Sequence, residues 1–365
     1  MSGPLRLELH QTRVSARTTW WVAALADTGG RTGLGESSDA GPGARRAWAL
    51  AAALLRAGLP PQEVLARLRA DTSTPPLARH TVHGALEQAL TDLRARQADV
   101  PLWQALGAAA ARPVHRYANI NRALRTRTPE EFAEVAAAAE AAGYRAVKCA
   151  PFDGLPPAHR LREGLARARA TRRALRPGTA LMVDAHLLLG VEEVLAAARE
   201  LSALDLRWLE DAVPLDDAAG LAAVHAACIA PLAGGEFATE PAQVRTALRS
   251  GHLDWLLPDV KHSGGYAAAR RLAEEAAQAG VRVSLHNPAG PVGTAAGLHL
   301  AAALGPDTET EFAFGETPWR DAVVTSAEPP HGPWLTPPHG SGLGLGLVAR
   351  HWRVVPLPRL DGALG

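Results

Sequence analysis

LRWLEDAVP, residues 206–214, joins an apolar run to two adjacent carboxylates and then reaches a proline. The run has the length of a buried strand, and Glu210 and Asp211 stand at its carboxyl end. Burial of a carboxylate is costly unless a cation or hydrogen-bond donors meet it. The segment therefore predicts a strand that carries acidic groups to a site where something positively charged binds.

The same unit, a short apolar run with a polar end followed by an amphipathic helix, recurs between residues 113 and 316. Eight strand candidates are HRYANIN (115–121), YRAVKCA (144–150), ALMVDAH (180–186), LRWLED (206–211), PLAGGEF (231–237), DWLLPDV (254–260), VRVSLHN (281–287) and TEFAFGE (310–316). Intervening helices are plainest at 129–143, 190–205, 240–251 and 265–280. Eight such units are what a (β/α)₈ barrel requires. A doubly wound open sheet would give the same alternation, but no G-x-G-x-x-G turn follows an early strand.

The residues before 113 are organised differently. LRLELHQT (5–12) and TTWWVAALADTGGRTGLGE (18–36) alternate apolar and polar residues around a glycine-rich turn, which predicts a small antiparallel meander. Two Ala/Leu-rich helical stretches follow at 44–58 and 79–97. We therefore expect an α/β protein with an α+β unit over residues 1–112 and a barrel over 113–320.

Composition excludes several classes of function. The chain has 365 residues and 47% hydrophobic content, enough to bury a sizeable core. Its 38 basic and 37 acidic residues leave no broad basic field for nucleic acid or an anionic membrane. No signal peptide or apolar run of membrane-spanning length stands out, and Cys149 and Cys228 lie outside any CxxC motif, as reduced thiols would. We expect a soluble, cytoplasmic protein that binds neither nucleic acid nor membrane.

Polar residues end six of the predicted strands, and the active face of such a barrel lies at those ends. They are Lys148, Asp184, Glu210, Glu236, Asp259 and His286. Asp184, Glu210 and Glu236 follow one another at equal steps of 26 residues, so three carboxylates should surround one point. A divalent cation would relieve their repulsion, and an all-carboxylate set favours Mg²⁺ first and Mn²⁺ second over zinc. The alternative, solvated acids or helix caps, suits one such residue better than three in register.

Six segments together resemble the enolase superfamily and, within it, the mandelate racemase subgroup. They are VKCAPFDG (147–154), MVDAH (182–186), WLEDAVP (208–214), GGEFAT (234–239), LPDVKHSGG (257–265) and VSLHNPAGPVG (283–293). The resemblance covers nearly the whole chain and implies a modified (β/α)₈ TIM barrel. It also implies that the segment 321–365 returns to an α+β capping domain built mainly from residues 1–112. Self-association is usual in this superfamily, so a homo-oligomer is implied as well.

The resemblance further implies the chemistry. Mg²⁺ would be held by Asp184, Glu210 and Glu236 and would bind a substrate carboxylate. The shared reaction is abstraction of the proton alpha to that carboxylate, which gives an enediolate. Two negative charges on such an intermediate need fixed positive charge nearby.

Asp259 and His286 resemble the subgroup's His-Asp dyad, in which the imidazole is the base and the carboxylate holds its tautomer. A core or capping role is the alternative for His286, and Asp259 on the adjacent strand argues against it. Where relatives often carry Lys-x-Lys, this chain has Ala150 at the second lysine position. We therefore expect Lys148 to neutralise the substrate carboxylate rather than act as a base, with a structural ion pair as the alternative.

Two further strand ends carry candidates for acid chemistry. His186 stands two residues beyond Asp184, on the same side of the strand. It could serve as a general acid or second base, or as an outer hydrogen-bond partner of the metal carboxylates; dehydratases of sugar acids in this superfamily include members with Asp-x-His here. On the eighth strand Glu311 resembles the protonated hydrogen-bond donor to the enediolate, and Glu316 is the alternative.

Candidates for substrate binding lie on the first barrel strand, in the lid loop of the capping domain and after the eighth strand. They are Arg17, Thr19, Tyr117, Asn119, Asn121 and Glu316. The neutral groups suit polyol hydroxyls, although asparagine at a strand end is also a common turn residue.

Three functions compete. The first is a carbon–oxygen lyase, a Mg²⁺-dependent dehydratase that converts an aldonic or aldaric acid sugar to a 2-keto-3-deoxy acid, with the small carboxylate as its partner. The second is an epimerase, racemase or lactone cycloisomerase of the same superfamily. The third is a barrel that binds a metal and an acid ligand without catalysis, which the complete ligand set and dyad disfavour.

Overall fold

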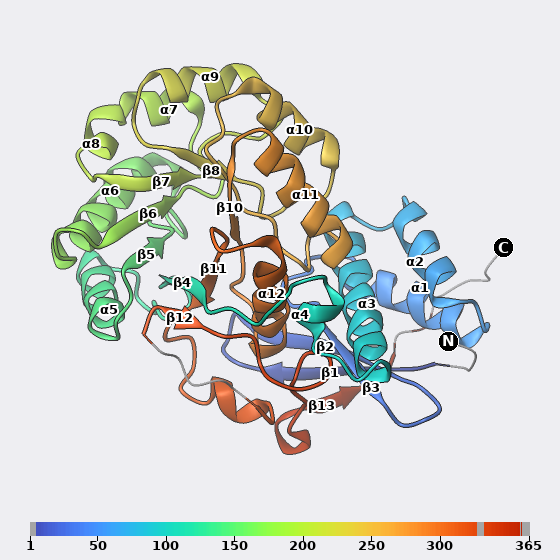
Figure 1. Ribbon diagram of the computed structural model, residues 1–365. Helices are drawn as coiled ribbons and strands as arrows, with labels where there is room; N and C mark the ends of the chain where they lie inside the picture. The colour runs from blue at the N-terminus through green and yellow to red at the C-terminus, as the bar shows by residue number, and fades with distance from the viewer. Residues whose placement is uncertain (1–4, 327–331, 358, 360–365) are drawn as a thin grey trace.

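The computed structural model describes residues 5–326, 332–357 and 359. Eight parallel strands form a barrel ringed by helices, and an antiparallel sheet with three helices lies against it (Figure 1). The fold class expected from the sequence, a modified TIM barrel with a capping domain, is confirmed. Within the expected terminal segments, residues 1–4, 327–331, 358 and 360–365 lie outside the described part of the chain.

The barrel strands coincide with the eight segments predicted from the sequence. They are β4 (Val114–Asn119), β5 (Ala146–Cys149), β6 (Ala180–Asp184), β7 (Leu206–Glu210), β8 (Leu232–Gly234), β9 (Trp255–Leu256), β10 (Arg282–Leu285) and β11 (Glu309–Ala313). Consecutive strands pair in parallel, and β11 also pairs with β4, Glu311 lying opposite Tyr117. This last pairing closes the sheet and removes its edges.

Helices on the outside of the barrel follow the strands. They are α5 (Pro129–Ala141), α6 (Pro157–Ala174), α7 (Val191–Ala196), α8 (Ala198–Ser202), α9 (Ala218–Ala226), α10 (Pro241–Ser250), α11 (Tyr266–Gln278) and α12 (Pro291–Leu304). Four of these begin with proline, whose fixed φ suits the first helical turn. The single helix expected over 190–205 is divided, because α7 ends at Ala196 before α8 begins.

Alternation along each strand separates two cores. Trp208, two residues before Glu210, points into the barrel, where it packs with Tyr117, Met182 and Trp255. Leu209 points the other way, into the layer between strands and helices. The interior aromatic cluster fills the barrel beneath the carboxyl ends of its strands, so those ends form the floor of any site above.

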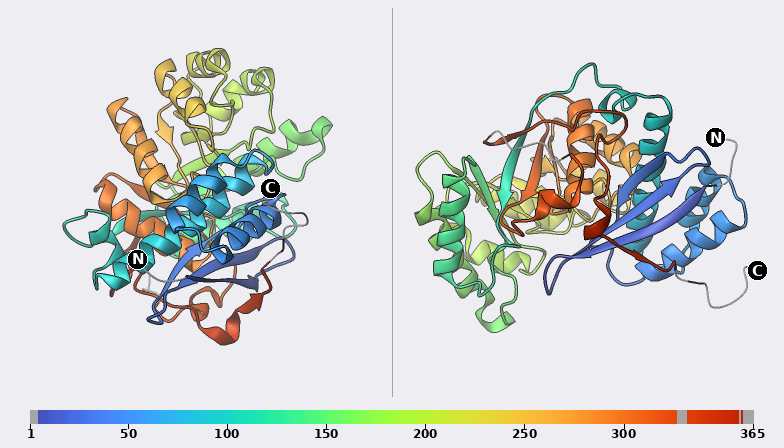
Figure 2. Two further views of the ribbon diagram at one scale, coloured as in Figure 1. Left: turned by 90° about the vertical axis from the view of Figure 1, so that its right-hand side faces the viewer. Right: turned by 90° about the horizontal axis from the view of Figure 1, so that it is seen from below.

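The capping sheet has the order β13-β1-β2-β3 and is antiparallel throughout. Its strands are β1 (Arg6–Arg13), β2 (Thr19–Ala26), β3 (Thr32–Glu36) and β13 (Arg353–Val355). The C-terminal strand β13 lies beside β1, with Val355 opposite Leu9, and the right view of Figure 2 shows this red strand alongside the blue strands of the sheet. Helices α1 (Ala44–Arg56), α2 (Pro61–Ala70) and α3 (Pro76–Gln97) share a buried core with one face of the sheet. The short elements α4 (Leu102–Ala105) and β12 (Trp334–Leu335) complete the described chain together with two 3₁₀ turns.

Two acids of the capping domain, buried Glu36 and half-buried Glu87, bind the N-termini of barrel helices. Both oxygens of Glu36 accept hydrogen bonds at the start of α12, from the N–H groups of Gly290 at 2.6 Å and Gly293 at 2.7 Å. Glu87 of α3 accepts from the first N–H of α11, that of Tyr266, at 2.8 Å. Because free N–H groups and the helix dipole favour anions there, these contacts fix the capping domain on the barrel.

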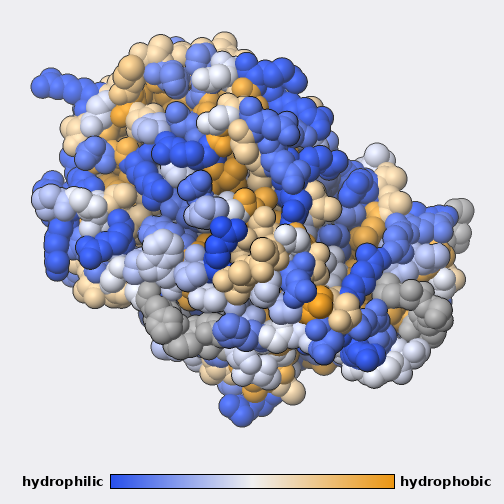
Figure 3. Space-filling model, viewed as in Figure 1, coloured by the Kyte–Doolittle hydropathy of each residue, from blue (hydrophilic) through white to orange (hydrophobic). Residues whose placement is uncertain are grey.

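The surface is that of a mixed polar and apolar globular protein. On the face in Figure 3 hydrophilic residues are interspersed with hydrophobic ones. Within the described residues, no helix is both long enough and apolar enough to cross a bilayer.

The contact between α3 and the loop after β9 can be tested by adding one carbon. A Cβ at Gly84 would lie 2.3 Å from the carbonyl oxygen of Lys261, whereas a Cβ at Gly297 would meet Thr310 at an ordinary 3.7 Å. We expect Gly84→Ala to lower the free energy of unfolding by about 1–3 kcal/mol through overpacking. Gly297→Ala, the matched control, should be neutral or slightly stabilising in the same thermal unfolding measurement. Equal stabilities of the two variants would contradict this docking.

Candidate active site

Carboxylates crowd the carboxyl ends of the barrel strands. Asp184 ends β6, Glu210 ends β7 and Glu236 follows β8, and each is at most 2% exposed. The strands that carry Asp184 and Glu210 pair with these two residues in register. Burial and the nearby Asp184 raise the pKa of Glu210 well above its usual value, although Lys148 opposes the shift. The three acids predicted from their equal spacing thus belong to one buried site.

Lys148 is the cation at the centre of this cluster. Its Nζ lies 2.7 Å from Glu210 Oε1, 3.2 Å from Glu311 Oε2 and 3.6 Å from Asp184 Oδ2. Burial alone would lower the pKa of Lys148, but Glu210 and Glu311 raise it well above its usual value. Lys148 is therefore a fixed positive charge in this structure, the state suited to binding a carboxylate and unsuited to a base.

Glu311, one of the two candidates on β11, belongs to the same cluster. It is fully buried, and Asn119 and the backbone N–H of Asn287 donate to it. Burial would raise its pKa, but Lys148 and His286 outweigh burial and lower it. Its part as a protonated donor stays a prediction, since these neighbours favour the ionised form.

Glu316 lies in a separate ionic network. Arg122 contacts it at 3.1 Å and reaches Asp39 of the capping domain at 2.6 Å. Arg320 approaches its other oxygen at 3.6 Å. Glu316 thus helps to tie the strand-end loops to the capping domain, and Glu311 is the better placed of the two for chemistry.

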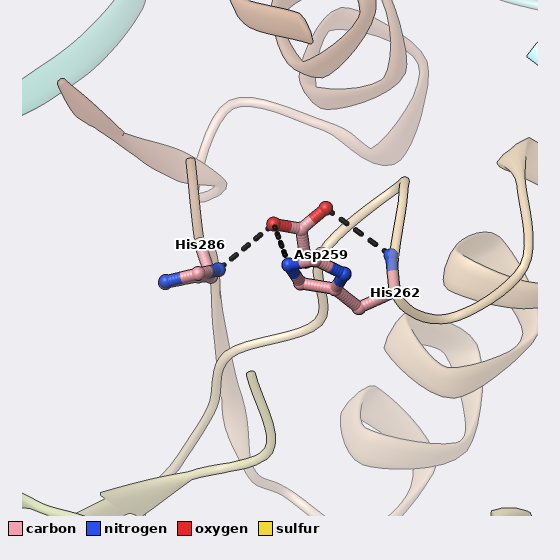
Figure 4. A group of neighbouring side chains, drawn as sticks. All are labelled: Asp259, His262 and His286. Atoms are coloured by element: carbon pink, nitrogen blue, oxygen red, sulfur yellow. Dashed lines mark hydrogen bonds and ion pairs between the residues drawn. The ribbon is translucent and has the colours of Figure 1, made fainter. Parts of the chain in front are cut away.

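Asp259 and His286 form the expected dyad (Figure 4). His286 Nδ1 lies 2.8 Å from Asp259 Oδ2, and its Nε2 lies 2.9 Å from Glu236 Oε2 and 3.8 Å from Glu311 Oε2. Burial would lower the pKa of His286, but Glu236, Glu311 and Asp259 raise it to about 10. One ring nitrogen is therefore held by Asp259, and the other faces the acidic cluster.

His186 forms a second imidazole–carboxylate pair on another side of the cluster. Its Nδ1 lies 2.7 Å from Asp153 Oδ1, and its Nε2 lies 2.9 Å from Asp184 Oδ2. Burial opposes charge on the ring, but Asp184 and Asp153 raise the pKa of His186 to about 12. The residue has a φ of 46°, a conformation that L residues adopt sparingly and that often marks a functional position. His186 is thus held as a protonated acid beside the first candidate metal ligand.

Among the residues that the structure describes, two groups of three side chains could each hold a metal ion. In the first, ligand atoms of Asp184, His186 and Glu236 lie within 4.8 Å of one another. Glu210 faces the same cluster, but its two oxygens accept hydrogen bonds from Lys148 and from Trp208 Nε1 at 2.9 Å. Asp184 Oδ2 is buried, and its charged neighbours are His186 Nε2 at 2.9 Å and Lys148 Nζ at 3.6 Å. Carboxylate oxygens gathered in this way fit a hard divalent cation.

The second group, Asp259, His262 and His286, is drawn in Figure 4. The Nζ of Lys261 already lies 2.6 Å from Asp259 Oδ2. Because this ammonium group occupies the carboxylate, the second group is a poor metal site, and the dyad interpretation suits it better.

Of the first-strand candidates, only Asn119 reaches the acidic cluster. Tyr117 packs inside the barrel, its ring centroid 5.4 Å from that of Trp208, below the carboxylates. Asn121 accepts from the backbone N–H of Ala150 at 2.7 Å and so joins two strand-end loops. Asn119 positions Glu311, which makes it a support for the cluster.

Arg17 and Thr19 line a cavity of about 880 Å³ in the capping domain. Asp39 lines the same cavity and pairs with Arg122 from the loop after β4. The cavity therefore adjoins the ionic network that borders the barrel mouth, but it does not include the catalytic candidates.

Four residues near the site were not among the site candidates taken from the sequence, although Asp211 was noted there as an acid at the end of its strand. Asp211, half-buried with a φ of 45°, has its pKa raised well above the usual value by burial, Glu236 and Asp184. Asp153 and Lys261 contact His186 and Asp259, as described above. Phe237, 48% exposed, places its ring 6.1 Å from that of His286. Asp211 directly follows Glu210, and Lys261 stands two residues after Asp259; this nearness to predicted site residues is a signal that could have identified them.

Comparisons with known proteins were consistent with this geometry. The sequence model of the family described as Enolase C-terminal domain-like matches residues 131–350. The crystal structure of a mandelate racemase/muconate lactonizing enzyme from Jannaschia sp. CCS1 is similar at a TM-score of 0.82 and 25% identity, covering 95% of each chain.

Two curated relatives carry the names of enzymes that act on sugar acids. A D-mannonate dehydratase from Caulobacter sp. (strain K31) is 28% identical over 73% of this chain and 72% of its own length. A 3,6-anhydro-alpha-L-galactonate cycloisomerase from Streptomyces coelicolor is 33% identical over 52% of this chain, which spans about half (50%) of that relative.

A divalent cation should displace protons from the acidic cluster. The pKa of His286, about 10, means that its proton is retained at pH 7 while the carboxylates lack a cation, and the pKa of Glu210 is shifted in the same direction. Binding should release at least one proton, so apparent affinity should rise about tenfold per pH unit for each proton released. Calorimetric titration with MgCl₂ in two buffers of different ionisation enthalpy measures this number. Binding without net proton release would contradict the electrostatic description.

Proposed function

The chain belongs to the enolase superfamily, in the mandelate racemase subgroup, and we propose that it is a Mg²⁺-dependent dehydratase of an acid sugar. The reaction would remove the proton alpha to the carboxylate and the hydroxyl of the neighbouring carbon, and the resulting enol would become a 2-keto-3-deoxy acid. One observation carries the proposal: two imidazoles, His286 and His186, contact different members of one carboxylate cluster, each oriented by its own acid. Dehydration needs such a base and such an acid.

His286 is the proposed base. Asp259 accepts from Nδ1, which leaves the lone pair of a neutral ring on Nε2, the atom that faces the cluster. The pKa of about 10 makes the ring a strong base once its proton has been lost. The orientation is set before substrate arrives, which lowers the reorganisation needed in the transition state.

His186 is the proposed general acid. Asp153 and Asp184 keep it protonated, and donation of a proton to the leaving hydroxyl produces water. This hydroxyl must leave as water because hydroxide is a poor leaving group. Lys148, ionised and buried, would neutralise the substrate carboxylate as negative charge develops on it.

Mg²⁺, held by Asp184, Glu210 and Glu236, would supply Lewis-acid stabilisation of that charge. The crowding of these buried acids supports this ligand set. The donors are all oxygens, which suits Mg²⁺, and Mn²⁺ would be the substitute.

The similarity to a D-mannonate dehydratase supports dehydration, and the similarity to a cycloisomerase keeps a second function of the same superfamily open. An epimerase or cycloisomerase would use His286 to remove the same proton and would return a proton or expel a ring oxygen instead. A screen of acid sugars with a semicarbazide assay for keto acids, run beside exchange in D₂O, separates these outcomes. Keto product supports dehydration, whereas exchange without keto product supports the second function.

Removal of one ligand charge tests the metal site. Glu210→Gln should weaken Mg²⁺ binding at least tenfold and abolish most activity, because a neutral amide is a poorer ligand for a hard cation. Glu309→Gln is the matched control. Glu309 begins β11, at the end of the strand away from the site, and the substitution also removes one carboxylate charge. The Mg²⁺-induced shift in Tm reports binding in both variants. Retention of full activity after exhaustive treatment with EDTA would reject a metal requirement.

Loss of the base should stop chemistry without stopping binding. We expect His286→Asn to reduce kcat by about 10³-fold or more while substrate still protects the protein thermally. Asp259→Asn should be defective too, and the double variant should be no worse than His286→Asn because both act on one proton transfer. Exchange of the alpha proton in D₂O is the direct measurement. Exchange of the alpha proton at the wild-type rate in His286→Asn would show that another residue is the base.

A further inference from the structure

Lysine occurs at only two positions of the chain, Lys148 and Lys261, among 38 basic residues. Arginine supplies every other permanently charged side-chain cation, so nothing in the composition favours lysine at these two places. Both lysines are buried, Lys148 completely and Lys261 at 2% exposure, and both contact acids of the candidate site. A compact ammonium group fits such a position where a planar guanidinium does not. Lys148 is part of the function proposed above, but Lys261 is not.

Lys261 holds the same carboxylate that orients the proposed base. Its Nζ donates to Asp259 Oδ2 at 2.6 Å, and its backbone N–H donates to Oδ1 at 2.6 Å. His286 Nδ1 lies 2.8 Å from that same Oδ2. Both oxygens of Asp259 are thus fixed by one residue, which leaves the carboxylate little freedom to turn away from the imidazole.

The backbone around Lys261 is fixed as well. Its carbonyl oxygen lies against Gly84 of helix α3, so closely that a Cβ there would be 2.3 Å away. Helix α3 of the capping domain therefore packs against the backbone of Lys261, and the side chain of Lys261 in turn holds Asp259. The ammonium group also offsets a buried negative charge that would otherwise be costly.

We propose that Lys261 is the positioning residue of the base, holding Asp259 in the orientation that directs His286 Nε2 toward the acidic cluster. This inference rests on the proposed function, because it assigns Lys261 a part in the same proton transfer. Lys261 acts through Asp259 and does not touch the reacting atoms.

Two other interpretations fit the contacts less well. Lys261 is poorly placed as a base, because its Nζ is buried and bonded to a carboxylate. The neighbouring His262 cannot hold Asp259 in place of Lys261. Its Nδ1 is hydrogen-bonded to Thr81, and its Nε2 lies 3.8 Å from Asp259 Oδ2, beyond hydrogen-bond distance.

Lys261→Met tests the inference, since it removes the ammonium group and keeps the aliphatic chain. We expect kcat and the rate of alpha-proton exchange to fall together by about 10- to 100-fold, with KM changed less than about threefold, because the loss lies in the proton-transfer step. Lys261→Gln, which keeps a hydrogen-bond donor without the charge, should show a smaller loss of kcat. Arg271→Met, which removes an exposed cation from helix α11, is the control and should match the wild type.

The decisive experiment is a double-mutant cycle with Asp259→Asn. If Lys261 acts through Asp259, adding Lys261→Met to Asp259→Asn should leave kcat unchanged within about twofold. The pair should also be more stable than Asp259→Asn alone, because that single variant leaves a buried lysine without its partner. If Lys261→Met alone does not fold, the double variant of Lys261→Met with Asp259→Asn and the single variant Lys261→Gln provide the test.

Two results would overturn the inference. One is a folded Lys261→Met enzyme with kcat within twofold of the wild type, and the other is an undiminished effect of Lys261→Met in the Asp259→Asn background. Failure of the proposed function looks different, because the wild type would then neither exchange the alpha proton nor form keto acid with any acid sugar. A defective Asp259→Asn beside a normal Lys261→Met would reject only the role of Lys261.

Discussion

Repulsion among buried carboxylates is the constraint on which the rest of the site depends. Asp184, Glu210, Glu236 and Glu311 are each at most 2% exposed, and half-buried Asp211 adds a fifth acid. Such crowding is tolerated only where cations or protons offset it. Lys148 supplies one fixed charge, and the raised pKa values of His186 and His286 have the same origin. A divalent cation would complete this compensation, so one electrostatic demand accounts for the proposed metal ligands, the proposed acid and the proposed base.

Two parts of the fold enclose the acidic cluster: the aromatic core of the barrel lies below it, and the capping domain packs beside the loops that surround it. Aromatic residues fill the barrel directly beneath the carboxylates, which keeps the strand ends from collapsing inward. From the other side the capping domain binds two barrel helices through Glu36 and Glu87, and its Gly84 packs against Lys261. The position of the capping domain and the geometry of the dyad are therefore mechanically linked through the loop after β9.

Much of this architecture could be predicted from the sequence, because it follows from the recurrence of one strand–helix unit and from the even spacing of the acids at the strand ends. The eight apolar runs became the eight barrel strands, and the equal steps between Asp184, Glu210 and Glu236 placed them at one mouth. Contacts between distant segments could not be predicted in this way. The pairing of His186 with Asp153 and the burial of Tyr117 below the site depend on how side chains turn within a closed barrel. Local pattern also missed the break between α7 and α8, since no proline or glycine marks it.

The central claim is that one carboxylate cluster binds a metal and an acid substrate between His286 and His186. A crystal structure with Mg²⁺ and an unreactive acid sugar tests it most directly. The account predicts the ion on Asp184, Glu210 and Glu236, the substrate carboxylate beside Lys148, and His286 Nε2 within hydrogen-bond reach of the alpha carbon's proton. An ion bound instead by Asp259, His262 and His286, or an acid sugar seated away from both imidazoles, would contradict it.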